Sequence, residues 1–166
     1  MGAWGSRRLS DYVKFCWPFL LLVAIAGIIR LALSLGGVSN STAKWFSMTA
    51  LVWIGVLVYS VRVHLSRFGG YKELFVICAL MNLIAQGIAI SGIVLAIFTG
   101  TNNIFSSPEF AFGGNGATWL HAIAHLFIGT TLGSLVPWAV GSGILAGIRR
   151  LSGSERKAKQ EFAKSR

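Results

Sequence analysis

Two histidines stand four residues apart in an otherwise apolar stretch, ATWLHAIAHLFIG, at residues 117–129. Residues at this spacing lie on one face of an α-helix, so His121 and His125 are placed to act on one ligand. The same four-residue series continues with Gly129 and Gly133. Small residues let a second helix or a flat ligand approach the backbone closely. The pattern therefore indicates a contact face, with metal binding, tetrapyrrole binding and interhelical hydrogen bonding as its alternative uses.

Metal catalysis is disfavoured by the shortage of further ligands. Zinc takes at least three protein ligands. Only Glu109, which precedes the helix, is available to join the pair. Residue 122 is alanine, so the pair does not form the HExxH motif of zinc proteases.

A tetrapyrrole remains an alternative, because haem or chlorophyll needs one axial histidine and a smooth wall. His125 with Gly129 and Gly133 would supply both. Two histidines on one helix turn cannot ligate opposite faces of one haem, and His64 is expected at the other membrane surface. The sequence thus allows a five-coordinate haem or a chlorophyll. A quinone carrier using the same residues is a related alternative.

The simplest interpretation is that the histidines are polar residues of a membrane helix. His121 would then lie among lipid head groups. His125 would hydrogen-bond to Gln86, to Ser91 or to a backbone carbonyl. Such interhelical bonds stabilise membrane proteins by about 0.6 kcal/mol each on average. We favour this interpretation.

Arg30 is the charged residue within the apolar stretches that most needs a partner. A central arginine costs about 2.5–3.5 kcal/mol on insertion scales. We expect it to extend toward the surface or to pair with Glu109; alternatively, it holds an anionic head group or a cofactor carboxylate. A helix rise of about 1.5 Å per residue places Arg30 and His125 at similar depth. The predicted outer pocket comprises His125, His121, Arg30, Gly129, Gly133 and Gln86.

Four long apolar stretches must position these residues. Mean hydropathy is +0.68 and only 12% of residues are charged, about half the usual share in soluble domains. A membrane-spanning helix needs roughly 20 residues, and none of the stretches alternates as a barrel strand would. The sequence predicts an all-α integral membrane protein, a four-transmembrane-helix antiparallel bundle. Its spans lie at about 15–35, 45–63, 74–98 and 119–147, with a kink expected at Pro137.

The basic residues give the orientation of these spans. Thirteen of fifteen lie before the first span, around the link between the second and third, or after the fourth. Positive residues favour the cytoplasmic side, so both termini are predicted to be cytoplasmic, and we expect a bacterial inner membrane. The net charge of +10 then reflects topology, with no nucleic acid as partner. Residues 1–14 form the cytoplasmic N-terminus, 15–147 the bundle and 148–166 a basic tail.

Two segments outside the spans carry further expectations. In the tail, Ser152 and Glu155 form a capping-box pattern, and Glu155 and Lys159 are spaced to pair on a helix. Its cations should attract anionic head groups by about 1 kcal/mol each near the surface, although a solvated tail is equally compatible. The loop at about 99–118 carries Phe105, Phe110 and Phe112. It is expected either to fold over the outer mouth of the bundle or to act as a passive linker.

The sequence contains no phosphate-binding loop, no paired carboxylates and no nucleophile beside a base. We therefore expect a non-catalytic accessory or scaffold subunit that contacts other membrane subunits or a second copy of itself. The alternative is a tetrapyrrole- or quinone-binding electron-transfer or pigment subunit. A small transporter is a third possibility, disfavoured by the absence of acidic residues within the predicted spans.

Overall fold

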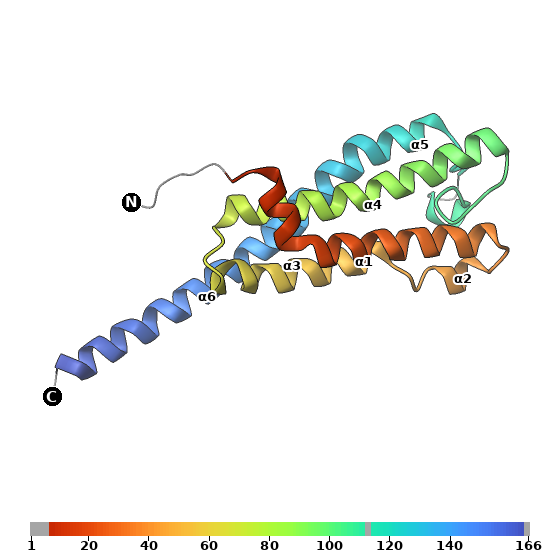
Figure 1. The fold of residues 1–166 in the computed structure, drawn as a ribbon. Coiled ribbons are helices and arrows are strands. Elements are labelled where there is room, and N and C mark those ends of the chain that lie inside the picture. The colour runs from red at the N-terminus through yellow and green to blue at the C-terminus, as the bar shows by residue number, and fades with distance from the viewer. Residues whose placement is uncertain (1–6, 112–113, 165–166) are drawn as a thin grey trace.

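The computed structural model describes residues 7–111 and 114–164, with the backbone alone for 155–162 and 164. All regular structure in this part of the chain is helical (Figure 1). The elements are α1 (Leu9–Leu35), α2 (Asn40–Ala43), α3 (Met48–Leu65), α4 (Tyr71–Thr99), the 3₁₀ turn η1 (Pro108–Phe110), α5 (Trp119–Ala124), the π-helical segment η2 (His125–Gly129) and α6 (Thr130–Lys164).

The prediction of four long apolar helices is confirmed. In the described residues, four helical segments are long and apolar enough to cross a membrane, at 9–35, 40–65, 71–99 and 119–154. They extend beyond the predicted spans partly because polar residues cap their first turns. Asp11 accepts a hydrogen bond from the Arg8 amide at 3.0 Å, and Glu73 accepts one from the Gly70 amide at 2.6 Å. These carboxylates satisfy amides that a helix start leaves unpaired.

Each long segment runs antiparallel to the one before it (Figure 1). Helices α3 and α4 contact each other, and each contacts both α1 and α6. Among the described residues, α1 and α6 share no comparable backbone contact. Glycines bring some of these helices close together: a Cβ on Gly55 would lie 2.6 Å from Met81 Sδ, and one on Gly141 would lie 2.8 Å from Ser60 Oγ. The two outer helices therefore flank a closely packed central pair.

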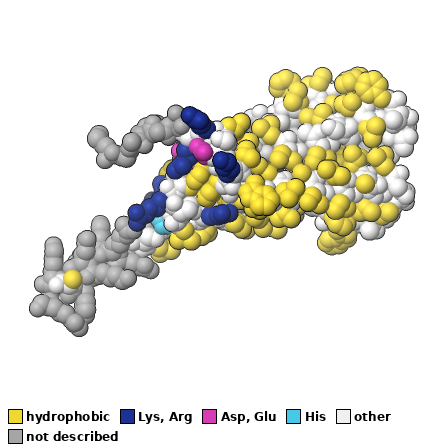
Figure 2. Space-filling view, in the orientation of Figure 1, with side chains coloured by type: hydrophobic (Ala, Val, Ile, Leu, Met, Phe, Trp, Pro, Cys, Tyr) yellow, Lys and Arg dark blue, Asp and Glu magenta, His cyan; other side chains and the backbone are white. Residues whose placement is uncertain are grey.

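The outer surface of the bundle is largely apolar. Large hydrophobic side chains are exposed along every long helix. In the most apolar stretch of the fourth segment, only 11% of the residues are buried. Figure 2 shows hydrophobic side chains over the wide part of the molecule and lysines and arginines gathered where it narrows. Soluble monomers rarely expose contiguous apolar patches above a few hundred Å². This surface is compatible with a multi-pass membrane protein.

The fourth segment contains an irregular turn that was not predicted from the sequence. Helix α6 includes Pro137, at which a kink is expected. The irregularity lies earlier, in the π-helical segment η2. There the Asn82 side-chain amide donates to the carbonyls of Gly129 and Thr130, at 3.2 and 3.0 Å. A π turn disturbs the regular hydrogen-bond ladder, and Asn82 supplies a donor from α4 at that point.

The tail does not begin a separate helix at Ser152, because α6 continues without a break to Lys164. Instead of capping a new helix, the Ser152 hydroxyl lies 3.3 Å from His64 Nε2 at the end of α3. The predicted Glu155–Lys159 pair involves side chains outside the described ones. Phe112 also lies outside the described residues.

Candidate functional site

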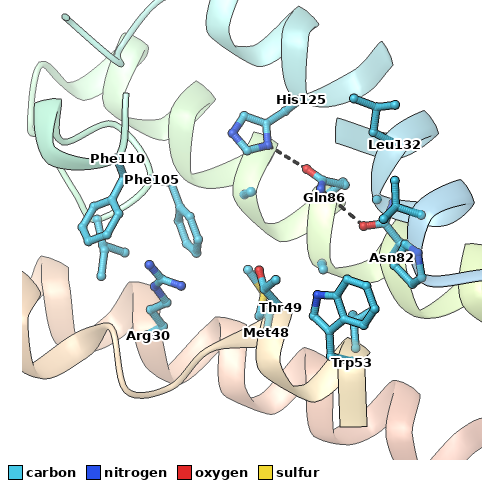
Figure 3. Close-up of a pocket in the computed structure, with 17 residues that line it drawn as sticks. Arg30, Met48, Thr49, Trp53, Asn82, Gln86, Phe105, Phe110, His125 and Leu132 are labelled. Carbon is cyan, nitrogen blue, oxygen red and sulfur yellow. Dashed lines mark hydrogen bonds between the residues drawn. The ribbon is translucent and has the colours of Figure 1, made fainter. Parts of the chain in front are cut away.

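A pocket of about 290 Å³ is lined by residues of α1, α3, α4 and the fourth segment and by the loop that follows α4 (Figure 3). Four of the six residues predicted to form an outer pocket line it: Arg30, Gln86, His125 and Gly133. Arg30 and His125, for which a similar depth is expected, thus line one cavity. Helix α3 adds Met48, Thr49, Val52 and Trp53 to its wall.

Arg30 lies at one end of the pocket, below the loop that follows α4. Its Cζ atom is 5.4 Å from the ring centroids of both Phe105 and Phe110. These cation–π contacts favour the charged group. The buried Nε atom has no hydrogen-bond partner among the residues that the structure describes. Among the described residues, Arg30 forms no ion pair with Glu109, whose side chain is exposed. The guanidinium is thus positioned by aromatic rings and still lacks an acceptor for Nε.

The loop over the pocket is held by Asn103, which is only 2% exposed. Its side-chain amide donates to the Gly92 carbonyl at 2.7 Å, and its side-chain oxygen accepts from the Phe105 amide at 3.0 Å. Gly92 leaves room for this contact, because a Cβ there would lie 2.6 Å from Phe105 Cδ2. Phe105 and Phe110 thus fold back over the bundle and line the pocket, as one of the two expectations for this loop had it.

A chain of polar side chains forms another wall. His125 Nδ1 lies 2.7 Å from Gln86 Oε1, and Gln86 Nε2 donates to Asn82 Oδ1 at 3.3 Å. Asn82 Nδ2 also donates to Ser134 Oγ at 3.1 Å. With Gln86 assigned as acceptor, His125 carries its proton on Nδ1, and Nε2 is a hydrogen-bond acceptor. The other ring nitrogen points away from Gln86 (Figure 3). Of the three partners expected for His125, the structure shows Gln86.

His121 and Gly129 do not line this pocket. The His121 ring is 4.8 Å from that of His125, but its Nδ1 atom lies 2.9 Å from the Gly116 carbonyl. A Cβ on Gly129 would lie 2.8 Å from Gln86 Oε1, so this glycine makes room for Gln86. No group of three or more histidine, cysteine or acidic side chains in the described part of the chain could hold a metal ion.

Asn82 and Trp53 were missing from the predicted pocket. Asn82 stands four residues before Gln86, a spacing that places both side chains on one face of α4. This spacing could have indicated that the two side chains are hydrogen-bonded. Trp53 gave no comparable signal, since tryptophans are common in membrane helices near the interface. Only the packing of α3 against α4 brings it to the cavity.

No protein-family model matches the sequence, and no curated protein or solved structure shows significant similarity to it.

Proposed function

We propose that this chain is an integral membrane protein that crosses the bilayer four times, with both termini in the cytoplasm. The apolar outer surface of the bundle supports insertion. The orientation is supported by the cations gathered at one end of the molecule (Figure 2). There Arg149 donates to the Gly69 carbonyl, and Arg7 lies over the Phe68 ring. This cationic end would face the cytoplasm according to the positive-inside rule.

Within that membrane, the pocket between α1 and α6 binds an amphiphile with an acidic head group, its carboxylate at Arg30 and its apolar part toward Trp53. The decisive observation is the buried Arg30 Nε, which finds no acceptor in residues 7–111 and 114–154 and lies in a segment that would be in hydrocarbon. Buried polar groups are normally hydrogen-bonded. Lipid supplies no acceptor at that depth, whereas a ligand carboxylate would accept the bond and neutralise the charge.

The size of the pocket favours a ligand with a single acyl chain or a single ring. Its volume of about 290 Å³ is at the lower limit of common small-molecule sites, roughly 300–1,000 Å³. A tetrapyrrole would need the helices to move apart. A quinone head group is the second candidate, because the acceptor nitrogen of His125 and the donor groups of Arg30 line the same cavity. Those groups match the hydroxyl of a quinol and the carbonyl of a quinone.

The role that follows is that of a non-catalytic accessory subunit that holds or presents this amphiphile. His125 is paired with the neutral amide of Gln86. In an acid–base or nucleophilic site, a side chain orients the base toward a nucleophile or another reacting group. The pairing of His125 with Gln86 supplies no such group. Other membrane subunits, or a second copy of the chain, would contact the exposed apolar face of α6.

Tryptophan fluorescence offers a direct test, because Trp53 lines the pocket. The purified protein is titrated with dibromostearate, whose bromines quench nearby tryptophans, and Trp53→Phe isolates the contribution of Trp53. We expect saturable quenching, with Arg30→Gln weakening it at least about tenfold, as for loss of a charged hydrogen bond. Arg150→Gln, at the other end of the molecule, should leave it unchanged.

Equal affinity in Arg30→Gln and the wild type would contradict this function. An absorption spectrum of the purified protein tests the tetrapyrrole alternative. A Soret or chlorophyll band that disappears in His125→Ala would replace the acidic amphiphile with a ligated tetrapyrrole.

A further inference from the structure

A second pocket, of about 360 Å³, lies at the end of the bundle opposite Arg30. It is lined by His64 and Leu65 from the end of α3, Arg67 and Gly69 from the following turn, and Arg149 from α6. We propose that this pocket binds the phosphate head group of an anionic phospholipid. Phosphate binding here requires the proposed membrane placement but does not depend on the Arg30 pocket.

The backbone of Arg67 is the first observation behind this site. Helix α3 ends in a Schellman turn, in which the Phe68 amide donates to Val63 O and the Arg67 amide to His64 O, both at 3.2 Å. Arg67 occupies the left-handed position of that turn, with φ of +51°. Glycine is strongly preferred there, because a side chain costs about 1–2 kcal/mol.

The turn retains this conformation because its next residue is anchored. The Phe68 ring stacks on Phe15 at 3.9 Å and meets the edge of Tyr12 at 5.6 Å. Packing of Phe68 therefore stabilises a backbone that disfavours arginine. A strained residue that persists in such a setting commonly marks a functional position. The side chain carried by this strained backbone is the exposed guanidinium of Arg67.

Arg149 gives the pocket a second, oriented guanidinium. Its Nη2 donates to the Gly69 carbonyl at 3.0 Å, and its Cζ lies 5.0 Å from the Tyr71 ring centroid. These contacts fix the planar group while leaving other N–H donors for a ligand. Two arginines from different elements therefore line one pocket, and guanidinium groups bind phosphate through paired hydrogen bonds.

Two neighbouring groups define what else a phosphate would meet. His64 Nε2 and Ser152 Oγ are 3.3 Å apart and join α3 to α6 at the pocket wall. The carboxylate of Glu73 is also close, since a Cβ on Gly70 would contact both Glu73 Oε2 and Arg149. That oxygen accepts a hydrogen bond from the Gly70 amide and caps α4. Beside the pocket there are thus two guanidinium charges and one carboxylate, which leave a net positive charge for a phosphate.

The choice of a lipid over a soluble phosphate compound follows from Leu65. This side chain lines the pocket and is 74% exposed. It gives the pocket one apolar side at the level where α3 and α4 meet the predicted membrane surface. Basic pockets between helix ends on the cytoplasmic side suit anionic head groups. A phospholipid would place its phosphate between the arginines and its acyl chains along α3.

The strain at Arg67 makes the test selective. Glycine at this position relieves the backbone, so Arg67→Gly should fold with an unchanged or raised melting temperature while losing the cation. The full-length variants are compared in detergent for stabilisation by added phosphatidylglycerol, with phosphatidylcholine as reference. We expect Arg67→Gly and Arg149→Gln each to weaken the response to phosphatidylglycerol about tenfold, as for loss of a charged hydrogen bond. Arg67→Lys should retain part of it.

Arg150→Gln is the matched control, since Arg150 is exposed beside Arg149 but does not line the pocket. Equal losses in Arg150→Gln and Arg67→Gly would overturn the site, because they would indicate general attraction between a basic surface and an anionic micelle. Inorganic phosphate is tested in parallel. Stabilisation by inorganic phosphate without any by phosphatidylglycerol would overturn the lipid assignment. Binding of dibromostearate at the other pocket is unaffected by these variants, so the two proposals fail separately.

Discussion

Gln86 Oε1 lies 2.7 Å from His125 Nδ1 and joins α4 to the π-helical turn of the fourth segment. The same turn is held four residues earlier on α4, where Asn82 donates to the Gly129 and Thr130 carbonyls. The irregular turn and the polar chain thus form one connected unit. This arrangement satisfies the backbone from a neighbouring helix, as the proposed membrane placement would require, because freed carbonyls find no water in hydrocarbon.

The His125–Gln86 bond should appear as a coupling energy between the two side chains. His125→Ala, Gln86→Ala and the double variant are unfolded reversibly in mixed micelles, and their free energies of unfolding are compared. We expect a coupling of about 0.6–1.7 kcal/mol, the range measured for interhelical bonds in membranes. The pair Thr99→Ala and Gln86→Ala is the control, because Thr99 lies at the end of α4 and shares no partner with Gln86, and it should be additive to about 0.3–0.5 kcal/mol. Additivity in the first pair as well would contradict the bond.

Gly133 provides a test of how closely α6 approaches α4. A Cβ there would lie 2.5 Å from Asn82 Oδ1, and the hydrogen bonds of Asn82 limit its movement. We expect Gly133→Ala to lower the free energy of unfolding by about 1–3 kcal/mol through overpacking. Gly143 lies on the same helix, and a Cβ added there would meet nothing within 4 Å. Gly143→Ala should therefore be neutral or slightly stabilising, and equal effects at both sites would refute the close approach.

Asn103 should control how tightly the outer loop covers the Arg30 pocket. Asn103→Leu removes the bonds to Gly92 and Phe105 and leaves the buried Phe105 amide unpaired, at a cost of about 1–3 kcal/mol. Released Phe105 and Phe110 become sites for chymotrypsin. We expect faster cleavage of the loop by chymotrypsin in this variant, measured by mass spectrometry of the fragments. The exposed neighbour Asn102 gives the control Asn102→Leu, and equal cleavage of the two variants would count against the anchor.

The proposed topology can be read from thiol labelling without removing native cysteines. Cys16 and Cys78 are both 0% exposed and should not react with maleimide in the folded protein. Ser41→Cys, in the first outer loop, should be labelled in intact cells by a membrane-impermeant maleimide. Ser154→Cys, on α6, should be labelled only after the membrane is permeabilised. Labelling of both positions in intact cells would place the C-terminal segment on the wrong side.

Several features followed from the sequence alone. The four helical segments could be predicted because apolar stretches of that length have few alternatives in lipid or in a protein core. The similar depth expected for Arg30 and His125 followed from the fixed rise of a helix. The spacing of His125 left three acceptable partners open, and Gln86 was one of them.

Rotation of the helices about their axes was decided only by tertiary packing. In a soluble helix the polar face identifies the apolar core face. Here both faces are apolar, so hydropathy could not show that Trp53 faces the pocket while His121 turns to the Gly116 carbonyl. Nor could it show that Arg30 meets two phenylalanine rings instead of Glu109. The π turn and the left-handed Arg67 likewise depend on contacts between segments distant in sequence, with Asn82 and with Phe15, which local patterns do not encode.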